Sequence, residues 1–278
     1  MGSSKGDQEF IGFERSAAAS DLDRNLELLV RNGYFVIENV FDEGLLQETR
    51  ERMDRIWAAQ LDEYGEELLE RIGGYGVMRA MMKTDPFFLE FIRQPTWFPY
   101  VEATVGGTAI LHLQNGVVAQ PNRPHNQGRY HRDFPKNFLP SKMLSFNAFT
   151  AIDDFTPETG ATWVVPGTHR FEALPSEDYV RSHEVQLSVS AGSVVCFDSM
   201  LWHKGGQNRS SEIRRGMNHQ YTRPFIKQQL DYPVIMGGEV DLESPIAQTL
   251  GMWAIPPKSV AEYRVSDPKK RTYRGGQG

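Results

Sequence analysis

The sequence predicts an α+β protein in which N-terminal helices pack on the outside of a β-core. Apolar residues at helical spacing, preceded by capping residues, concentrate before residue 107, whereas short β-prone runs separated by Gly, Pro and Asn follow from residue 108. No internal repeat or long polar linker interrupts the chain. We therefore expect one domain over residues 1–278, with helical support in 1–107, a strand-rich core in 108–226 and a C-terminal extension in 227–278.

Local signals define the first helix and the first strand. Ser20, with Asp23 three positions later, is typical of a helix N-terminus, and Gly33 is typical of a helix end. "YFVIENVF", residues 34–41, follows as a short strand. The expected buried stripe of the helix comprises Leu22, Leu26, Leu29 and Val30.

More helix is predicted up to residue 94. Asp42 can cap a second helix, and Asp85 with Pro86 can begin another over residues 85–94. Between them, residues 62–84 hold "IGGYG" amid charged and Met-rich sequence, which fits a lid or a plain surface loop equally well. The apolar stripe of the second helix comprises Leu45, Leu46, Thr49, Met53, Ile56 and Trp57.

Strand candidates dominate the sequence after residue 108. Their density implies a sandwich or a barrel, because many short strands separated by turn residues are typical of those architectures. In chain order they are 108–120, 128–134, 143–152, 162–167, 185–198 and 216–225.

Composition and charge limit the partners of the protein. A net charge of −6 and a pI near 5.7 argue against nucleic acid and against an anionic membrane surface. The single cysteine, Cys196, cannot form an internal disulfide, and its apolar surroundings "SVVCF" favour a buried thiol in a reducing compartment. No run approaches the roughly 20 apolar residues of a membrane span, and "MGSSKGDQEF" lacks the apolar core of a signal peptide. We expect a cytoplasmic protein, and its oligomeric state stays open.

The segment "YHRDFP", residues 130–135, carries the first sign of chemistry. In a strand, His131 and Asp133 would project to one side and Tyr130 and Arg132 to the other. An H-x-D pattern alone is weak evidence, so a metal site needs a third ligand. The candidate is His203, which ends a buried strand and is followed by glycines. Two histidines and one carboxylate with open positions opposite form the facial triad of non-haem Fe(II) oxygenases.

These segments also resemble the phytanoyl-CoA dioxygenase family of Fe(II)- and 2-oxoglutarate-dependent oxygenases. "NGYFVIENVFDEGLLQETRERM" resembles the first strand and long helix of the family, and "HRD" resembles its H-x-D motif. "GATWVVPGTHR" is similar to the turn after its middle strand. "WHKGGQNRSSEIRRGMNHQYT" resembles its distal-histidine segment, in which an arginine follows the histidine by eleven positions. The resemblance covers most of the chain, in the same order.

The resemblance implies a double-stranded β-helix, a jelly roll related to the cupins, with Fe(II) held by His131, Asp133 and His203. It also implies 2-oxoglutarate as cosubstrate and O2 as oxidant. The remote carboxylate of 2-oxoglutarate needs a fixed cation, and the spacing from His203 favours Arg214 over Arg215. An aromatic wall of the cosubstrate pocket and a hydrogen-bond donor are assigned to Phe149 and Gln114.

Other polar residues leave alternatives open. His112 shares a strand face with Gln114, so either both line the pocket or both form a satisfied polar pair in the barrel. In a strand, His219 would point to the same side as Arg215 and opposite to Arg214, so we expect it outside the pocket. His169 is expected in a loop. Charged sequence surrounds His183, which should be solvated. Arg123, His125, Asn126 and Arg129 could bind a polar substrate or lie in a solvated loop.

The expected function is oxidation of a small molecule, most simply its hydroxylation, with release of succinate and CO2. A carboxylate at position 133 argues against halogenation, because related halogenases carry a small residue there and chloride takes its place. A jelly-roll protein that binds a small molecule without turnover, and a zinc hydrolase using the same three ligands, remain alternatives. Arg214 argues against both. Acyl-CoA substrates are not favoured, since no basic cluster suits the nucleotide phosphates.

Overall fold

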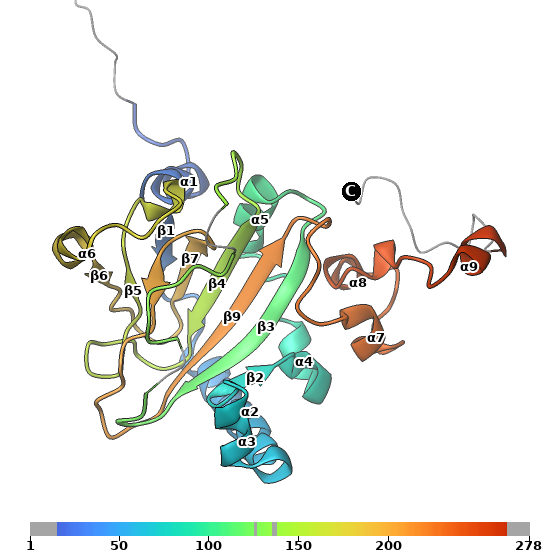
Figure 1. Ribbon diagram of the computed structural model, residues 1–278, viewed down its shortest axis with the longest axis horizontal. Coiled ribbons are helices and arrows are strands. Elements are labelled where there is room, and N and C mark those ends of the chain that lie inside the picture. The colour runs from blue at the N-terminus through green and yellow to red at the C-terminus, as the bar shows by residue number, and fades with distance from the viewer. Residues whose placement is uncertain (1–15, 125–126, 135–137, 266–278) are drawn as a thin grey trace, which may run out of the picture.

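The fold is a jelly-roll core of two antiparallel sheets with helices outside it, which confirms the predicted α+β class (Figure 1). The computed structural model describes residues 16–124, 127–134 and 138–265. The large sheet has the order β1 (Tyr34–Ile37), β7 (Val194–Asp198), β4 (Ser145–Ala151), β9 (Arg214–Thr222), β3 (Ile110–Ala119) and β2 (Val77–Arg79). The small sheet has the order β6 (Val185–Gln186), β5 (Trp163–Val164) and β8 (His203–Lys204).

Helices surround the sheets on several sides. In Figure 1 the helices α2 to α4 lie below the large sheet, α6 lies at the left beside the small sheet, and α7 to α9 lie to the right of β3. The α-helices are α1 (Asp21–Asn32), α2 (Glu43–Tyr64), α3 (Glu66–Arg71), α4 (Met81–Thr84), α5 (Phe98–Thr104), α6 (Glu177–His183), α7 (Tyr232–Met236), α8 (Pro245–Thr249) and α9 (Val260–Val265). The 3-10 turns are η1 (Pro86–Leu89), η2 (Thr168–Arg170) and η3 (Met252–Ala254).

The first two helices form where the capping residues predict them. The Ser20 hydroxyl accepts a hydrogen bond from the backbone N–H of Asp23, and Gly33 ends α1 with a φ of 85°, a conformation that favours glycine. Asp42 caps α2 in the same way. Leu29 is buried as expected, but Val30 is 56% exposed and lies outside the buried stripe. The predicted stripe of α2 is buried at Leu46, Thr49, Met53, Ile56 and Trp57.

Several predicted elements differ from the structure, and the strand expected over 185–198 forms two strands, β6 in the small sheet and β7 in the large sheet. Residues 62–84 form ordered elements, and Met78, Met81 and Met82 are completely buried, so the second half of this segment is part of the core instead of a surface loop. The helix expected over 85–94 is limited to the short turn η1. The strand expected over 128–134 is reduced to one bridge, because only His131 pairs with a neighbouring strand, at His203.

The large sheet has two faces with different neighbours. One face joins the main hydrophobic core beneath the helices, to which Phe35, Phe146, Cys196, Met217 and Tyr221 contribute. The opposite face of the same strands turns toward the small sheet and packs with a smaller cluster. Because side chains alternate along a strand, each central strand supplies both environments. The jelly roll thereby encloses a cavity between its sheets.

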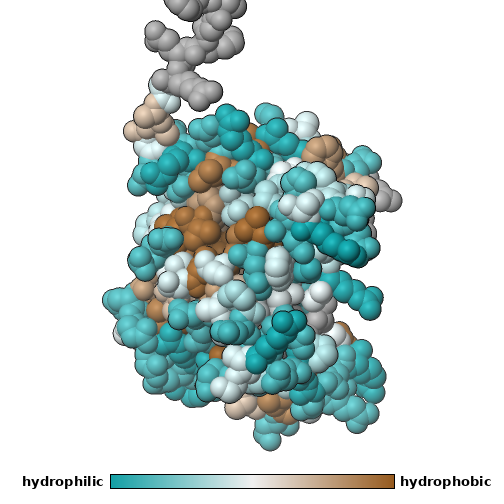
Figure 2. Space-filling view, turned by 90° about the vertical axis from the view of Figure 1, so that its left-hand side faces the viewer, coloured by the Kyte–Doolittle hydropathy of each residue, from teal (hydrophilic) through white to brown (hydrophobic). Residues whose placement is uncertain are grey.

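Figure 2 shows the side that carries α6 and β6, which is mainly polar, with hydrophobic side chains gathered in several places. Val185 in β6 and Leu174, which precedes α6, are exposed apolar residues. Within the described ranges, no helix combines the length and the hydrophobicity needed to cross a membrane.

Candidate functional site

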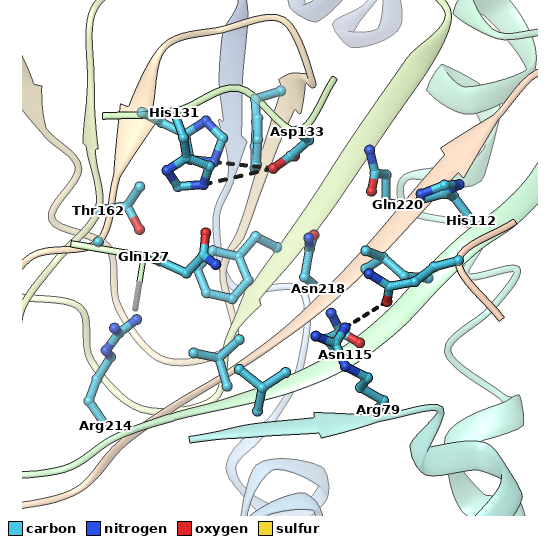
Figure 3. A pocket seen from close by; sticks show the side chains of 18 residues that line it. Arg79, His112, Asn115, Gln127, His131, Asp133, Thr162, Arg214, Asn218 and Gln220 are labelled. Carbon is cyan, nitrogen blue, oxygen red and sulfur yellow. Dashed lines mark hydrogen bonds and ion pairs between the residues drawn. The ribbon is translucent and has the colours of Figure 1, made fainter. Parts of the chain in front are cut away.

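Three side chains with metal-binding chemistry converge where β8 of the small sheet forms a bridge with His131. His131 Nε2 lies 3.9 Å and His203 Nε2 lies 3.8 Å from the same carboxylate oxygen, Oδ1 of Asp133. The two imidazole rings are 4.3 Å apart between centroids. One ligand atom from each residue lies within 4.8 Å of the other two. Figure 3 shows His131 and Asp133 pointing toward one another at the top of the cavity.

Backbone hydrogen bonds bring the three residues together although no regular strand contains His131. His131 and His203 exchange both backbone hydrogen bonds, with N–O distances of 2.9 and 3.1 Å. The backbone N–H of Asp133 donates to the carbonyl of Ser199 at 3.1 Å. Asp133 is therefore anchored to the segment between β7 and β8, four residues before His203. Local extension at the bridge is enough to place positions 131 and 133 on one side.

The hydrogen bonds of the imidazoles fix which nitrogen faces the site. Nδ1 of His131 lies 2.8 Å from the carbonyl of Arg129, and Nδ1 of His203 lies 2.9 Å from the carbonyl of Leu201. A carbonyl can only accept, so the proton of each neutral ring is on Nδ1 and the lone pair is on Nε2. Metal-binding histidines commonly have this arrangement, which orients the ring and sets its tautomer.

The donor set fits a divalent iron. Two imidazole nitrogens and one carboxylate oxygen approach from one side, while the cavity lies opposite. This is the ligand set that suits non-haem Fe(II) and leaves positions open for other ligands. His131, Asp133 and His203 are the residues that would hold the ion.

A cavity of about 310 Å³ adjoins the three residues. Figure 3 shows Arg214 and Thr162 on its left side and His112, Arg79 and Asn115 on its right. Polar side chains and a few apolar ones share its walls. They are Val77, Arg79, His112, Leu113, Asn115, Val117, Gln127, Phe149, Thr162, Phe197, Gly205, Arg214, Asn218, Gln220 and Gln229, together with His131, Asp133 and His203.

Arg214 is a buried cation with unused hydrogen-bond donors. Its residue is 3% exposed, and within the described residues Nε and Nη1 are buried with no hydrogen-bond partner. Its guanidinium lies 4.4 Å from the ring centroid of Phe155. Burial lowers the pKa of Arg214 to about 10, and the charge of Asp153 opposes this shift. A guanidinium in this state would gain strongly from an anion that enters the cavity.

The structure places the other two predicted cosubstrate residues differently. Phe149 lines the cavity from β4, with its ring centroid 5.3 Å from that of Phe155. Gln114 is fully buried, is absent from the cavity walls, and accepts a hydrogen bond from the N–H of Met82. Its amide nitrogen donates to the carbonyl of Phe88. The prediction that Gln114 donates into the pocket is therefore wrong.

An irregularity in β3 explains this error. The pairing of β3 with β9 shifts register between Leu111 and Leu113, which makes His112 an extra residue. His112 lines the cavity while Gln114 turns to the core, so strict alternation from 112 to 114 fails. Both alternatives predicted for His112 and Gln114 are therefore wrong, because the two side chains neither line the pocket together nor form a polar pair.

Three further histidines lie away from the three ligands. His219 is completely buried, lies outside the cavity walls as predicted, and contacts the Gln114 side chain. Burial lowers its pKa to about 3. His169 lies in η2 beside the carbonyl of Val30. His183 is exposed at the end of α6. Two of the four polar residues considered for substrate binding, His125 and Asn126, lie outside the described residues.

Sequence reasoning missed several residues of the cavity. Asn218 and Gln220 line it from β9, and their even numbering matches that of Arg214, so parity could have identified them. Asn147, on β4, contacts Asp133 directly; a polar residue in the apolar run "SFNAF" was the available signal. Arg79 lies on the edge strand β2, inside a segment for which the sequence predicts a loop or a lid.

Comparisons with known proteins agree with the fold and identify a family. The family model described as phytanoyl-CoA dioxygenase (PhyH) matches residues 29–216. Rv1501, an uncharacterized protein of Mycobacterium tuberculosis, is 42% identical over 266 residues, which cover 93% of this chain and 97% of that protein. Dioxygenase aneA of Aspergillus aculeatus is 25% identical over 256 residues, which cover 86% and 85%.

A solved structure shares the architecture. EctD from S. alaskensis, crystallised with 2-oxoglutarate and 5-hydroxyectoine, superposes with a TM-score of 0.62 at 18% identity, over 76% of this chain and 78% of that chain. At this identity the likeness concerns the fold. The family model spans more than half of the chain. The chain therefore belongs to the phytanoyl-CoA dioxygenase family.

Proposed function

We propose that the protein is an Fe(II)- and 2-oxoglutarate-dependent dioxygenase that oxidises a small molecule, most simply by hydroxylation. In this proposal His131, Asp133 and His203 hold the iron, and Arg214 binds the remote carboxylate of 2-oxoglutarate. Phe149 forms an apolar wall beside the cosubstrate. The open coordination positions face the cavity, where the 2-oxo acid group, O2 and the substrate meet.

The proposed reaction balances without another reductant. Iron with 2-oxoglutarate supplies the oxygen chemistry: one atom of O2 enters the succinate formed with loss of CO2, and the other enters the substrate as a hydroxyl. The chain positions the reactants and limits the access of water. The hydrogen removed from carbon returns as the hydrogen of that hydroxyl, so R–H becomes R–OH.

The observation that carries the proposal is the presence of Arg214 in the same cavity as the three ligands. A buried guanidinium with hydrogen-bond donors left over is costly unless an anion completes it. A bare hydrolytic metal site would have no use for such a cation. The family membership of the chain and the 2-oxoglutarate in the EctD structure support the same reading.

The cavity supports a small, polar substrate. Its volume of about 310 Å³ falls at the lower end of the range for small-molecule pockets. On the side away from Arg214 the walls carry Arg79, His112 and Asn115. A long acyl chain would cover these polar groups without satisfying them. We therefore favour substrates with several hydrogen-bonding groups over acyl chains.

An anaerobic titration tests the proposal. Purified apo-protein receives Fe(II) and then 2-oxoglutarate, and the visible charge-transfer band of an Fe(II)–2-oxoglutarate chelate is recorded. We expect the band in the wild type and its loss in His203→Ala, with the circular dichroism spectrum unchanged. A folded wild type without the band would overturn the proposal and favour a zinc site or a protein that binds without turnover.

A further inference from the structure

Asn147 contacts both the candidate metal site and the cavity wall from a fully buried position. It lies on β4 between Phe146 and Ala148, which both belong to the main core. Its amide nitrogen donates to Oδ2 of Asp133 at 2.9 Å and to the hydroxyl of Ser199 at 2.7 Å. Its amide oxygen accepts a hydrogen bond of 3.0 Å from the side chain of Asn218. All the hydrogen-bonding capacity of its amide nitrogen is thus used.

The direction of this hydrogen-bond chain is fixed from one end. The carboxylate of Asp133 can only accept, so Asn147 must turn its amide nitrogen toward it. The oxygen of Asn147 then faces Asn218, which must present its own nitrogen. As a result, Oδ1 of Asn218 is left on the cavity side, where it is buried with no hydrogen-bond partner among the described residues.

The two oxygens of Asp133 consequently have different surroundings. Oδ2 is held by Asn147, whereas Oδ1 is the oxygen that lies 3.9 Å from His131 and 3.8 Å from His203. A carboxylate fixed in this way offers one oxygen to an ion between the imidazoles. The second oxygen is kept from taking a further coordination position, which the chemistry needs to remain open.

We propose that Asn147 is a positioning residue that orients Asp133 for binding the metal through one oxygen, and that Asn218 holds Asn147 in the required orientation. The inference rests on the proposed function, because it assigns a role toward the same metal. Neither asparagine belongs to the metal ligands. Outer partners of this kind usually change metal affinity by roughly 10- to 100-fold when they are removed.

The test is metal binding by the intact protein, without turnover. Mn(II) is titrated anaerobically and the free ion is measured by electron paramagnetic resonance, and the visible spectrum of the Co(II) form reports coordination number. Asn147→Ala removes both donors, and Asn147→Leu removes them while filling the volume. Asn218→Ala removes only the support of Asn147 and lies at the partly exposed cavity wall, where folding is less at risk.

Asn25→Ala is a matched control. Asn25 is also a buried asparagine, and its amide donates one hydrogen bond of 2.8 Å to the hydroxyl of Tyr100, on the helical side of the molecule. It should lower the stability in a comparable way and leave the affinity for Mn(II) within about twofold. This variant separates a local effect on Asp133 from general destabilisation.

The expected result is an affinity for Mn(II) that falls about 10- to 100-fold in the two Asn147 variants and less, by roughly 3- to 10-fold, in Asn218→Ala. The Co(II) spectrum should change in the Asn147 variants and stay unchanged in Asn25→Ala. Wild-type affinity and spectrum in the Asn147 and Asn218 variants would overturn this inference alone. A wild type that binds no metal would overturn the proposed function together with it.

Discussion

Two adjacent arginines on β9 show how differently the two faces of the large sheet are used. Arg214 turns to the cavity, where Nε and Nη1 have no hydrogen-bond partner among the described residues. Arg215 turns to the other face and pairs with two carboxylates, Asp54 at 2.7 Å and Asp153 at 2.9 Å. The backbone N–H of Arg215 also donates to Asp153. Arg215 thus has carboxylate partners within the protein, whereas Arg214 keeps hydrogen-bond donors without a partner among the described residues.

This difference separates a structural charge from one kept for a ligand. A buried charge without partners costs several kcal/mol, so a fold keeps it where a bound anion offsets that cost. The histidines divide along the same line. His219 on the structural face is buried beside Gln114, whereas His131 and His203 turn their Nε2 atoms toward Asp133. Burial alone therefore does not identify a functional residue, but unused hydrogen-bonding capacity in a cavity does.

The largest effect is expected for Asp133→Ala on the cavity side. Removing one of three ligands should reduce Fe(II)-dependent turnover more than about 100-fold, the upper limit for an outer partner of a metal site. The measurement is succinate formation at saturating 2-oxoglutarate, together with the thermal unfolding midpoint of the apo-protein. Hydroxylase activity at the wild-type level in this variant would refute the assignment of the three ligands.

The next effect compares the two arginines directly. Arg214→Ala should raise the 2-oxoglutarate concentration needed for half-saturation by roughly 100-fold, because two charge-assisted hydrogen bonds at about 1.5 kcal/mol each are lost. Arg215→Ala should leave that concentration within about twofold and lower the stability instead. Titration of the charge-transfer band in both variants gives the answer. The reverse order would mean that the remote carboxylate lies on the other face.

A third variant tests the corrected role of Gln114. Gln114→Ala should lower the free energy of unfolding by about 1–3 kcal/mol, since it leaves the N–H of Met82 and the carbonyl of Phe88 without their partner. Urea unfolding measures this loss. The same variant should bind 2-oxoglutarate like the wild type. Impaired cosubstrate binding at unchanged stability would restore the original prediction.

The smallest effect concerns the pH dependence of stability at His219. Burial holds its folded pKa at about 3, below the ordinary value of 6.5. Between these values the unfolded chain binds more protons, so the stability contributed by this site is present above pH 6.5 and is lost as pH falls toward 3. At pH 5 the loss is roughly 2 kcal/mol. His219→Gln should lose less stability than the wild type between pH 7 and pH 5 in urea unfolding, and equal losses would contradict this account.

The sequence was sufficient for those parts of the fold and site that depend on local periodicity or short spacing. Ser20 and Gly33 bounded α1 correctly because capping is local. The two-residue spacing of His131 and Asp133 and the parity of Arg214 against Arg215 both follow from extended backbone. These features need no knowledge of distant contacts.

The remaining features depend on tertiary pairing. The register shift at His112 reversed the expected direction of Gln114, and no residue in "LHLQN" signals it. The sequence predicts a lid or a surface loop for the segment with Met78 and Met81, because the burial of this segment comes from distant elements, including β3. The contact between Asn147 and Asp133 could not be predicted, because both residues are held by hydrogen bonds to Ser199, which lies on a third segment of the chain.

The most direct test of the central claim is a crystal structure of the protein with Mn(II) and 2-oxoglutarate, grown without oxygen. The account predicts the ion on Nε2 of His131 and His203 and on one oxygen of Asp133, with the remote carboxylate of 2-oxoglutarate bound by Arg214. Such a complex would show the cavity-side arginine completed by an anion and Arg215 unchanged. A 2-oxoglutarate molecule bound away from Arg214, at Arg79 for example, or an ion outside the three ligands, would contradict it.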